Sequence, residues 1–462
     1  MDYILKNNDL IELDLTKQNK RFPVNESVLI TRNLIGRYFL IVNTFLDVCL
    51  VTDDYYDNSL DYCFKEFLLT PSDDIGVCQQ KYENSLIDLK EKYSDDVTFI
   101  LTITYKCNMK CSYCFQQNSK TLIRETMTLS TLSYILDVVE NYIKKNPNKT
   151  VHIGLFGGEP LLRSNEQIIN IIFEFCRKHK IKISITTNGL ELDYFAKKLV
   201  IYHSLIEGIG LTIDSVSTNE VTREVINKND TRNRFKKLVE IIKILLKYNV
   251  FVSVSSNFDS GNLKEMKANY DFFKTLYNYS DNFEWHVGRV DDRFYETGYE
   301  KIIDEVDILK EFLNLNINDA FTHLSILKAT YPLCKKLDIL GNQVEMKGIF
   351  NYCWSSSVSD YVFYIDQSLF VYRCPCTVGR EEYNIGRFSE GFLNNYKLRG
   401  YSYLDFDRCK NCPIGGYCSG GCFLSRQKDW DYFCKQEICT FNKFIDSIVI
   451  ERILKLLRVK DE

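Results

Sequence analysis

Short apolar runs rich in β-branched residues alternate with longer amphipathic stretches between residues 97 and 290. The runs have the length of strands, and the stretches repeat apolar residues with the helical period of about 3.6. This alternation predicts parallel strands in a full or partial barrel, whose chemistry lies in loops at the carboxyl ends of the strands. The expected strands are 97–104, 151–156, 182–187, 209–214, 251–256 and 283–288. The expected helices include 130–145, 165–179, 234–248 and 262–277.

The chain outside this region divides into three further parts. Residues 1–95 read as a small α+β unit, residues 311–350 as connecting helices after a barrel at 96–310, and residues 351–462 as a cysteine-rich unit. In the first part we expect strands at 27–33, 37–43 and 47–53 and helices at 58–69 and 83–93. The chain ends in an amphipathic stretch at 441–457, which predicts a closing helix.

Composition narrows the class of protein. The 462 residues are 45% hydrophobic and 26% charged, with a net charge of -4, so bulk charge suggests no nucleic-acid partner. The first residues lack the pattern of a signal peptide, and the most apolar span, 28–51, is interrupted by charges. We therefore expect a cytoplasmic protein without a membrane partner.

Cysteine is the unusual component, with 17 residues against five histidines. In a reducing compartment such cysteines are unlikely to form disulfides, and few histidines leave few zinc sites. Cys107, Cys111 and Cys114 lie just past the first expected strand of the barrel. A structural zinc needs four ligands, whereas three thiolates can hold a [4Fe–4S] cluster and leave one iron open.

The motif "CNMKCSYCF" resembles the signature of the radical S-adenosylmethionine (SAM) enzymes, whose core is a partial (β/α)6 barrel. The resemblance implies that SAM binds the open iron and contacts loops at the ends of later strands. The loop "FGGEP" alone reads as a turn, but in this family it binds the amino group of SAM. Ser215 stands where the family more often has glycine. The implied SAM-binding residues are Phe115, Gly157, Gly158, Glu159, Asn188, Asp214 and Arg223.

Nine further cysteines lie between residues 353 and 439, including the run "CKNCPIGGYCSGGC". This run resembles the SPASM extension, which binds two auxiliary [4Fe–4S] clusters in its relatives, although zinc knuckles have similar spacing. The resemblance assigns Cys353, Cys374 and Cys422 to the first auxiliary cluster, closed by Cys376 or left with an open iron. It assigns Cys409, Cys412 and Cys418 to the second, with Cys439 preferred over Cys434 as the fourth ligand.

The resemblance implies a radical SAM enzyme with one SAM-binding and two auxiliary [4Fe–4S] clusters. Reductive cleavage of SAM would need an external electron donor such as flavodoxin or ferredoxin. SPASM members commonly modify peptides, so the first expectation is a maturase that forms a thioether or carbon–carbon crosslink in a ribosomally made peptide. The enzyme alternative is an anaerobic sulfatase-maturing type that forms formylglycine. A non-catalytic protein stapled by iron–sulfur or zinc is the alternative of another class.

Two expectations concern parts without a motif. The remaining cysteines, 49, 63, 78, 176 and 334, are expected to pack in the core. The unit at 1–95 is expected either to recognise a leader peptide along a strand edge or only to pack on the barrel. No residue is assigned as the general base.

Overall fold

The structure is a computed structural model of the chain. It describes residues 3–6, 9–12, 29–34, 38–44, 48–52, 96–116, 125–217, 223–226, 234–292, 298–317, 320–322, 324–339, 361–395, 406–410, 412–418 and 420–461.

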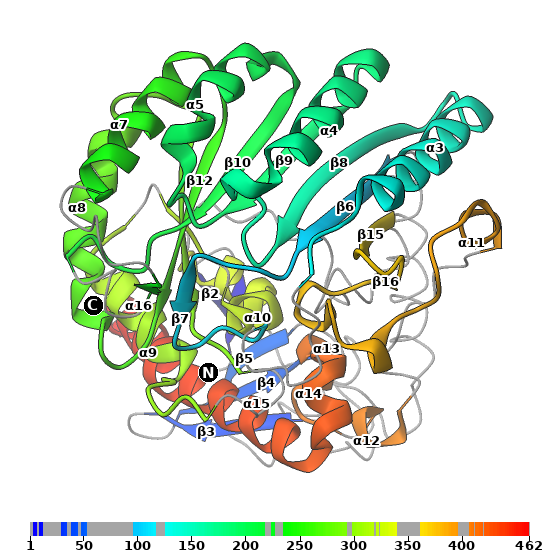
Figure 1. The fold of residues 1–462 in the computed structure, drawn as a ribbon. Coiled ribbons are helices and arrows are strands. Elements are labelled where there is room, and N and C mark those ends of the chain that lie inside the picture. Colours follow the sequence, from blue (N-terminus) through cyan, green and yellow to red (C-terminus); the bar gives the residue numbers. More distant parts are fainter. Residues whose placement is uncertain are drawn as a thin grey trace.

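A nine-stranded sheet forms the centre of the fold (Figure 1). From edge to edge it contains β14 (Phe321–Thr322), β13 (Phe283–Arg289), β12 (Val252–Phe258), β10 (Ile206–Thr212), β9 (Lys182–Thr187), β8 (Thr150–Gly157), β6 (Asp96–Thr104), β15 (Tyr361–Ile365) and β16 (Val371–Tyr372). All neighbours are parallel except the β15–β16 hairpin. The six strands expected from the pattern are all present, which confirms the α/β barrel.

Amphipathic helices cover the outer face of this sheet (Figure 1). In α4, for example, Ile168, Ile169, Ile172, Phe173 and Cys176 are buried, the spacing that one apolar helix face requires. The four expected helices are confirmed, whereas α5 was not predicted. These helices are α3 (Leu129–Lys145), α4 (Glu166–His179), α5 (Leu192–Ile201), α7 (Arg234–Lys247) and α8 (Met266–Tyr277), with 3-10 turns at Arg163–Asn165, His203–Leu205 and Leu263–Glu265.

A second, antiparallel sheet is formed near the N-terminus. Its order is β2 (Asp9–Glu12), β1 (Tyr3–Lys6), β5 (Val48–Thr52), β4 (Phe39–Asn43) and β3 (Leu29–Asn33). The three expected strands are β3, β4 and β5, while the β1–β2 hairpin was not predicted. The helices expected at 58–69 and 83–93 lie outside the described residues.

The N-terminal sheet packs against the C-terminal part of the chain. Arg32 on β3 donates hydrogen bonds to Asp446 at 2.6 Å and to Asn442 at 2.7 Å. Thr44 donates its hydroxyl to the carbonyl of Pro413 at 3.0 Å. The apolar residues of both parts belong to one core, so the N-terminal sheet is an integral part of the fold.

The C-terminal region continues the barrel sheet and then becomes helical. Strand β15 pairs parallel with β6, so the sheet crosses the boundary placed at residue 351 without a break. The closing helix expected at 441–457 is present as part of α15, a π-helical turn and α16. The elements are α9 (Glu305–Asn314), α10 (Ser325–Lys336), α11 (Glu390–Asn395), α12 (Asp407–Lys410), α13 (Gly415–Cys418), α14 (Phe423–Lys428), α15 (Trp430–Phe444), the π turn Ile445–Val449 and α16 (Ile450–Asp461), with 3-10 turns at Pro375–Thr377 and Glu381–Tyr383.

Among the helices in the described ranges, none has the length and apolar character needed to cross a membrane.

Candidate active site

The loop after β6 carries the three motif cysteines. It contains a short strand, β7 (Met109–Cys111), which pairs antiparallel with β11 (Arg223–Val225) and sets Arg223 opposite Cys111. The amide of Met109 donates to the Cys107 sulfur at 3.4 Å. Burial raises the pKa of the Cys107 and Cys111 thiols, and the nearby Cys114 thiol adds to both shifts. The three sulfurs therefore form one electrostatically coupled group.

Gly157 and Gly158 at the end of β8 lie against the backbone of the cysteine loop. A Cβ at Gly157 would lie 2.2 Å from the carbonyl oxygen of Thr104, and one at Gly158 would lie 2.4 Å from that of Lys106. The amide of Gly158 donates to Thr104 at 2.8 Å, and that of Glu159 donates to Lys106 at 2.9 Å. Only glycine allows this approach, so the pair fixes the start of the cysteine loop.

The carboxylate of Glu159 joins the ends of β8 and β9. It is 1% exposed and accepts hydrogen bonds from the amide of Leu161 at 2.8 Å, the hydroxyl of Thr187 at 2.6 Å and the amide of Asn188 at 2.6 Å. Burial raises the pKa of Glu159 to about 7 although these donors oppose the shift. One oxygen accepts two of the bonds and the other accepts one, so among the residues that the structure describes one acceptor position of this carboxylate has no partner.

Asn188 connects the carboxylate of Glu159 to Cys107, the first cysteine of the motif. Its side-chain amide donates to Asn108 at 2.7 Å and approaches the Cys107 sulfur at 3.6 Å. Its side-chain oxygen accepts from the amide of Leu190 at 2.9 Å. Glu159, Asn188 and Cys107 therefore form a continuous chain of contacts between three strand ends.

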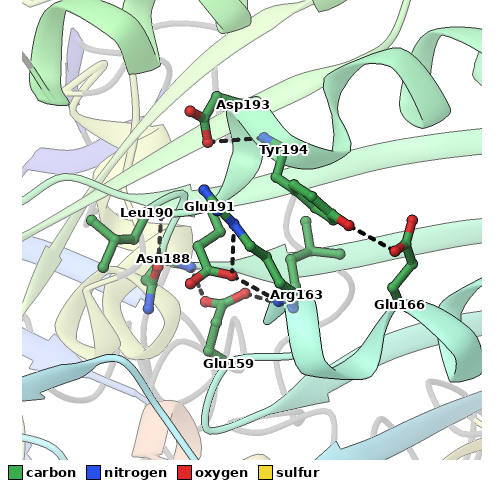
Figure 2. Close-up of polar contacts among 9 residues, drawn as sticks. Glu159, Arg163, Glu166, Asn188, Leu190, Glu191, Asp193 and Tyr194 are labelled. Atoms are coloured by element: carbon green, nitrogen blue, oxygen red, sulfur yellow. Dashed lines mark hydrogen bonds and ion pairs between the residues drawn. The ribbon is translucent and has the colours of Figure 1, made fainter.

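A second set of contacts joins the same loops farther from the cysteines (Figure 2). The amide of Arg163 donates to Glu191 at 2.7 Å, and the hydroxyl of Tyr194 donates to Glu166 at 2.7 Å. The guanidinium of Arg163 also lies 4.9 Å from the centre of the Tyr194 ring. These contacts fix the segments on which Glu159 and Asn188 stand.

Asp214 and Arg223 are brought together through a residue that the sequence did not reveal. The hydroxyl of Tyr113, between Cys111 and Cys114, donates to Asp214 and accepts from Arg223 at 3.0 Å. Burial, with the Asp214 charge, raises the pKa of Tyr113. The amide of Asn257 also donates to Asp214, at 3.1 Å. The only available signal for Tyr113 was its place inside the cysteine motif.

Arg223 also has unused binding capacity. It is 7% exposed, and within the described residues its buried Nε atom has no hydrogen-bond partner. A buried, unpaired guanidinium donor is costly and suits an anionic group such as the carboxylate of SAM. The donor set of this region therefore fits the cofactor. Phe115, the remaining expected contact residue, is partly exposed immediately after Cys114.

A second group of thiols lines a small chamber in the C-terminal region, which is partly open to solvent. Cys409, Cys412, Cys418 and Cys434 line it. Within the described ranges, no three His, Cys, Asp or Glu side chains converge tightly enough for a single metal ion. Four thiols around one chamber form a donor set that fits an iron–sulfur cluster.

The fourth thiol of this chamber differs from the preferred expectation. Cys439 is exposed and does not line the chamber, whereas Cys434 does. Both lie on α15, and five residues correspond to a rotation of about 140° around a helix, so the two thiols face different sides. The structure therefore favours Cys434, the alternative considered from the sequence.

The cysteines expected to hold the first auxiliary cluster also gather. Cys374 and Cys422 are buried in one apolar cluster with Phe433, and Cys376 packs against it. Cys353 lies outside the described residues. Of the cysteines expected in the core, Cys49, Cys176 and Cys334 are buried, and Cys63 and Cys78 lie outside the described residues.

Comparison with known proteins identifies the barrel. Residues 101–265 match the Radical SAM superfamily. The chain contains a radical SAM domain. Members of this superfamily are enzymes that use a [4Fe–4S] cluster and SAM, so the match supports the expectation of an enzyme.

Two curated relatives cover most of the chain. The radical SAM cyclopropyl synthase TigE of Paramaledivibacter caminithermalis is 24% identical over 78% of this chain and 75% of its own length. A cysteine-type anaerobic sulfatase-maturating enzyme of Clostridium novyi is 25% identical over 74% of this chain and 93% of its own length.

A solved structure shares the overall fold. Streptococcus suis SuiB, bound to its precursor peptide SuiA, aligns with a TM-score of 0.50 and 15% identity over 87% of this chain and 96% of SuiB. The barrel and the C-terminal region alone cannot supply that coverage, so the likeness extends into the N-terminal part.

Proposed function

We propose that this radical SAM enzyme is a peptide maturase that forms a thioether or carbon–carbon crosslink in a ribosomally made precursor. The observation that carries the proposal is the thiol-lined chamber of the C-terminal region in a chain that also contains a radical SAM domain. SuiB, which was solved with a precursor peptide, supports a peptide substrate. The curated sulfatase-maturating relative supports formylglycine formation as the second candidate.

In this proposal Cys107, Cys111 and Cys114 hold the SAM-binding cluster. When bound, the cluster and SAM supply a radical able to remove hydrogen from an unreactive carbon. Arg223 binds the carboxylate of SAM through its buried, unpaired donor. The unused acceptor position of Glu159 receives the ammonium of SAM.

The remaining assignments concern two auxiliary clusters. Cys409, Cys412, Cys418 and Cys434 hold one of them. Cys374, Cys376 and Cys422, with Cys353, hold the other. When bound at these cysteines, the clusters would supply sites able to accept an electron, and the reaction would also need an external donor such as flavodoxin or ferredoxin.

The N-terminal unit is proposed to recognise the leader of the precursor. Strand β3 is an edge strand of the described sheet, and an extended peptide can pair with such an edge. Along a strand, the N–H groups of successive residues point to opposite edges, so proline at Arg32 and proline at Thr31 or Asn33 remove N–H groups from different edges of β3. The variant whose unfolding midpoint is unchanged should lose affinity for a fluorescent precursor peptide. Unchanged fluorescence anisotropy in both variants would refute leader binding at β3.

The central experiment uses the short peptide encoded beside this gene, if one is present, expressed anaerobically together with the enzyme. A crosslink removes two hydrogen atoms and joins two residues in tandem mass spectra, whereas formylglycine reacts with a hydrazide probe. A variant with alanine at Cys107, Cys111 and Cys114 is the control and should form neither product nor 5′-deoxyadenosine. A hydrazide-reactive product from wild-type enzyme would favour the second candidate.

A further inference from the structure

Arg426 is a buried cation in the C-terminal region. It lies on α14, four residues after Cys422, and is 8% exposed. Its guanidinium carbon lies 4.2 Å from the centre of the Phe406 ring and 5.2 Å from that of Trp430. Its Nη1 atom donates to the carbonyl of Gly420 at 2.7 Å. Aromatic faces and one carbonyl therefore hold the charge in place.

This cation lies directly behind the wall of the thiol-lined chamber. Gly420 and Trp430, which contact Arg426, both line the chamber with Cys409, Cys412, Cys418 and Cys434. Gly420 has a φ of +81°, and a Cβ there would lie 2.9 Å from Nη1 of Arg426. The positive charge is therefore separated from the chamber only by residues that contact both.

Two other charged groups act on the chamber. Glu437 is among the residues that line it and brings a carboxylate to the chamber. Arg408 lies 5.7 Å from the Trp430 ring centre, but its side chain is 50% exposed and paired with Asp431. Solvent and salt screen an exposed charge much more than a buried one.

We propose that Arg426 raises the reduction potential of the iron–sulfur cluster held by Cys409, Cys412, Cys418 and Cys434, and that Glu437 lowers it. The proposal rests on the proposed function, because it assumes a cluster in the chamber. Reduction adds one electron, and thus one negative charge, to the cluster. A fixed cation stabilises that added charge, and a carboxylate destabilises it. The two residues together set how readily this cluster accepts an electron.

The test uses full-length, anaerobically reconstituted enzyme with alanine at Cys107, Cys111 and Cys114, which leaves only the auxiliary clusters. Dithionite titration with redox mediators, followed by electron paramagnetic resonance, gives their potentials. Arg426→Gln should lower the potential of one auxiliary cluster by about 59 mV, which corresponds to about a tenfold change in the equilibrium constant of a one-electron reduction. Glu437→Gln should raise the same potential, and Arg426→Lys should keep most of the wild-type value.

Arg408→Gln is the comparison variant, because it removes a second cation beside the Trp430 ring whose own side chain is half exposed to solvent. It should lower the potential less than Arg426→Gln does, because solvent and salt screen an exposed charge. An unaltered potential in Arg426→Gln, with iron content retained, would overturn the role of Arg426. If the Arg426→Gln variant loses its iron, the Glu437→Gln variant provides the test. An unchanged cluster potential in Glu437→Gln would refute tuning of the cluster by these charges.

A separate variant tests whether the chamber holds a cluster at all. Alanine at Cys409 and Cys412 should remove one of the two auxiliary signals and its share of the iron. If both signals remain, the assignment of the chamber fails, and with it this part of the proposed function. A cluster signal whose potential is unchanged in Arg426→Gln would instead contradict only the role of Arg426.

Discussion

Tyr105 and Tyr372 donate hydrogen bonds to the same carboxylate oxygen of Asp366, at 3.0 and 3.3 Å. Tyr105 lies two residues before Cys107, and Tyr372 lies two residues before Cys374. The three side chains are buried. One carboxylate therefore connects the loop of the three motif cysteines to the hairpin that leads to an expected auxiliary ligand.

Because both phenols bond one oxygen, their contributions to stability should be coupled. We expect Tyr105→Phe and Tyr372→Phe to lower the unfolding free energy by about 1 kcal/mol each. The effect of the double variant should deviate from the sum of the two by about 0.5 kcal/mol or more, because residues in one hydrogen-bond network typically show interaction energies of roughly 0.5–3 kcal/mol. Urea unfolding measures all four species. Strict additivity would show that the two bonds act independently. Tyr142→Phe, on a partly buried phenol of α3, is the control outside this network.

The turn before Tyr372 contains a strained residue. Leu369 has a φ of +66°, and Asp366 holds the turn by accepting from the amides of Ser368 at 2.9 Å and Phe370 at 3.0 Å. The left-handed conformation costs a non-glycine residue roughly 1–2 kcal/mol. Leu369→Gly should therefore destabilise the protein less than Leu369→Ala, although glycine removes more of the side chain. Chemical denaturation measures the stability of both variants. A lower stability of Leu369→Gly than of Leu369→Ala would mean that the turn relaxes.

Cys434 and Cys439 offer a matched pair on one helix. We expect Cys434→Ala to lower the iron content and to weaken the visible absorption of the reconstituted enzyme, because it opens the thiol-lined chamber. Cys439→Ala should retain full iron, since that thiol is exposed and outside the lining. Iron loss confined to Cys439→Ala would restore the expectation preferred from the sequence.

A pH effect should arise far from the cysteines. His152 on β8 lies 3.1 Å from the carboxylate of Glu207, and this hydrogen bond raises the pKa of His152 above 6.5 although burial opposes it. A raised folded pKa stabilises the protein fully below 6.5, and the gain is lost as pH rises through the folded value. The unfolding free energy of wild type minus His152→Gln should therefore be larger at pH 5.5 than at pH 9. A difference independent of pH would exclude the contribution.

The sequence predicted the local elements better than the contacts between them. Strands such as 97–104 are predicted by an uninterrupted run of apolar and β-branched residues, and the cysteine motif has a fixed spacing. The β1–β2 hairpin was missed because four-residue strands joined by Asn7 and Asn8 carry little periodic signal. Cys434 and Cys439 could not be separated by spacing alone, since the choice depends on which face of α15 points inward.

In the candidate site, too, the sequence reveals local motifs but not the contacts between distant residues. Glu159 and Asn188 could be proposed because they lie in recognisable loops, but their bonds to each other and to Cys107 could not. The roles of Tyr113, a spacer inside the cysteine motif, and of Asp366, which belongs to no motif, were missed because each acts through a partner from a distant part of the chain. Such long-range pairs follow from the assembled sheet and leave no periodic trace in the sequence.

The pairing of β15 with β6 has a consequence for synthesis of the chain. Strand β6 is made early, yet its neighbour on one side begins only at Tyr361. During translation at about 5–20 residues per second, β6 therefore waits for tens of seconds at the slow end of that range with one edge uncovered. An unpaired apolar edge is a template for wrong partners. The nascent barrel is thus most exposed to aggregation, and most dependent on chaperones, until the cysteine-rich region leaves the ribosome.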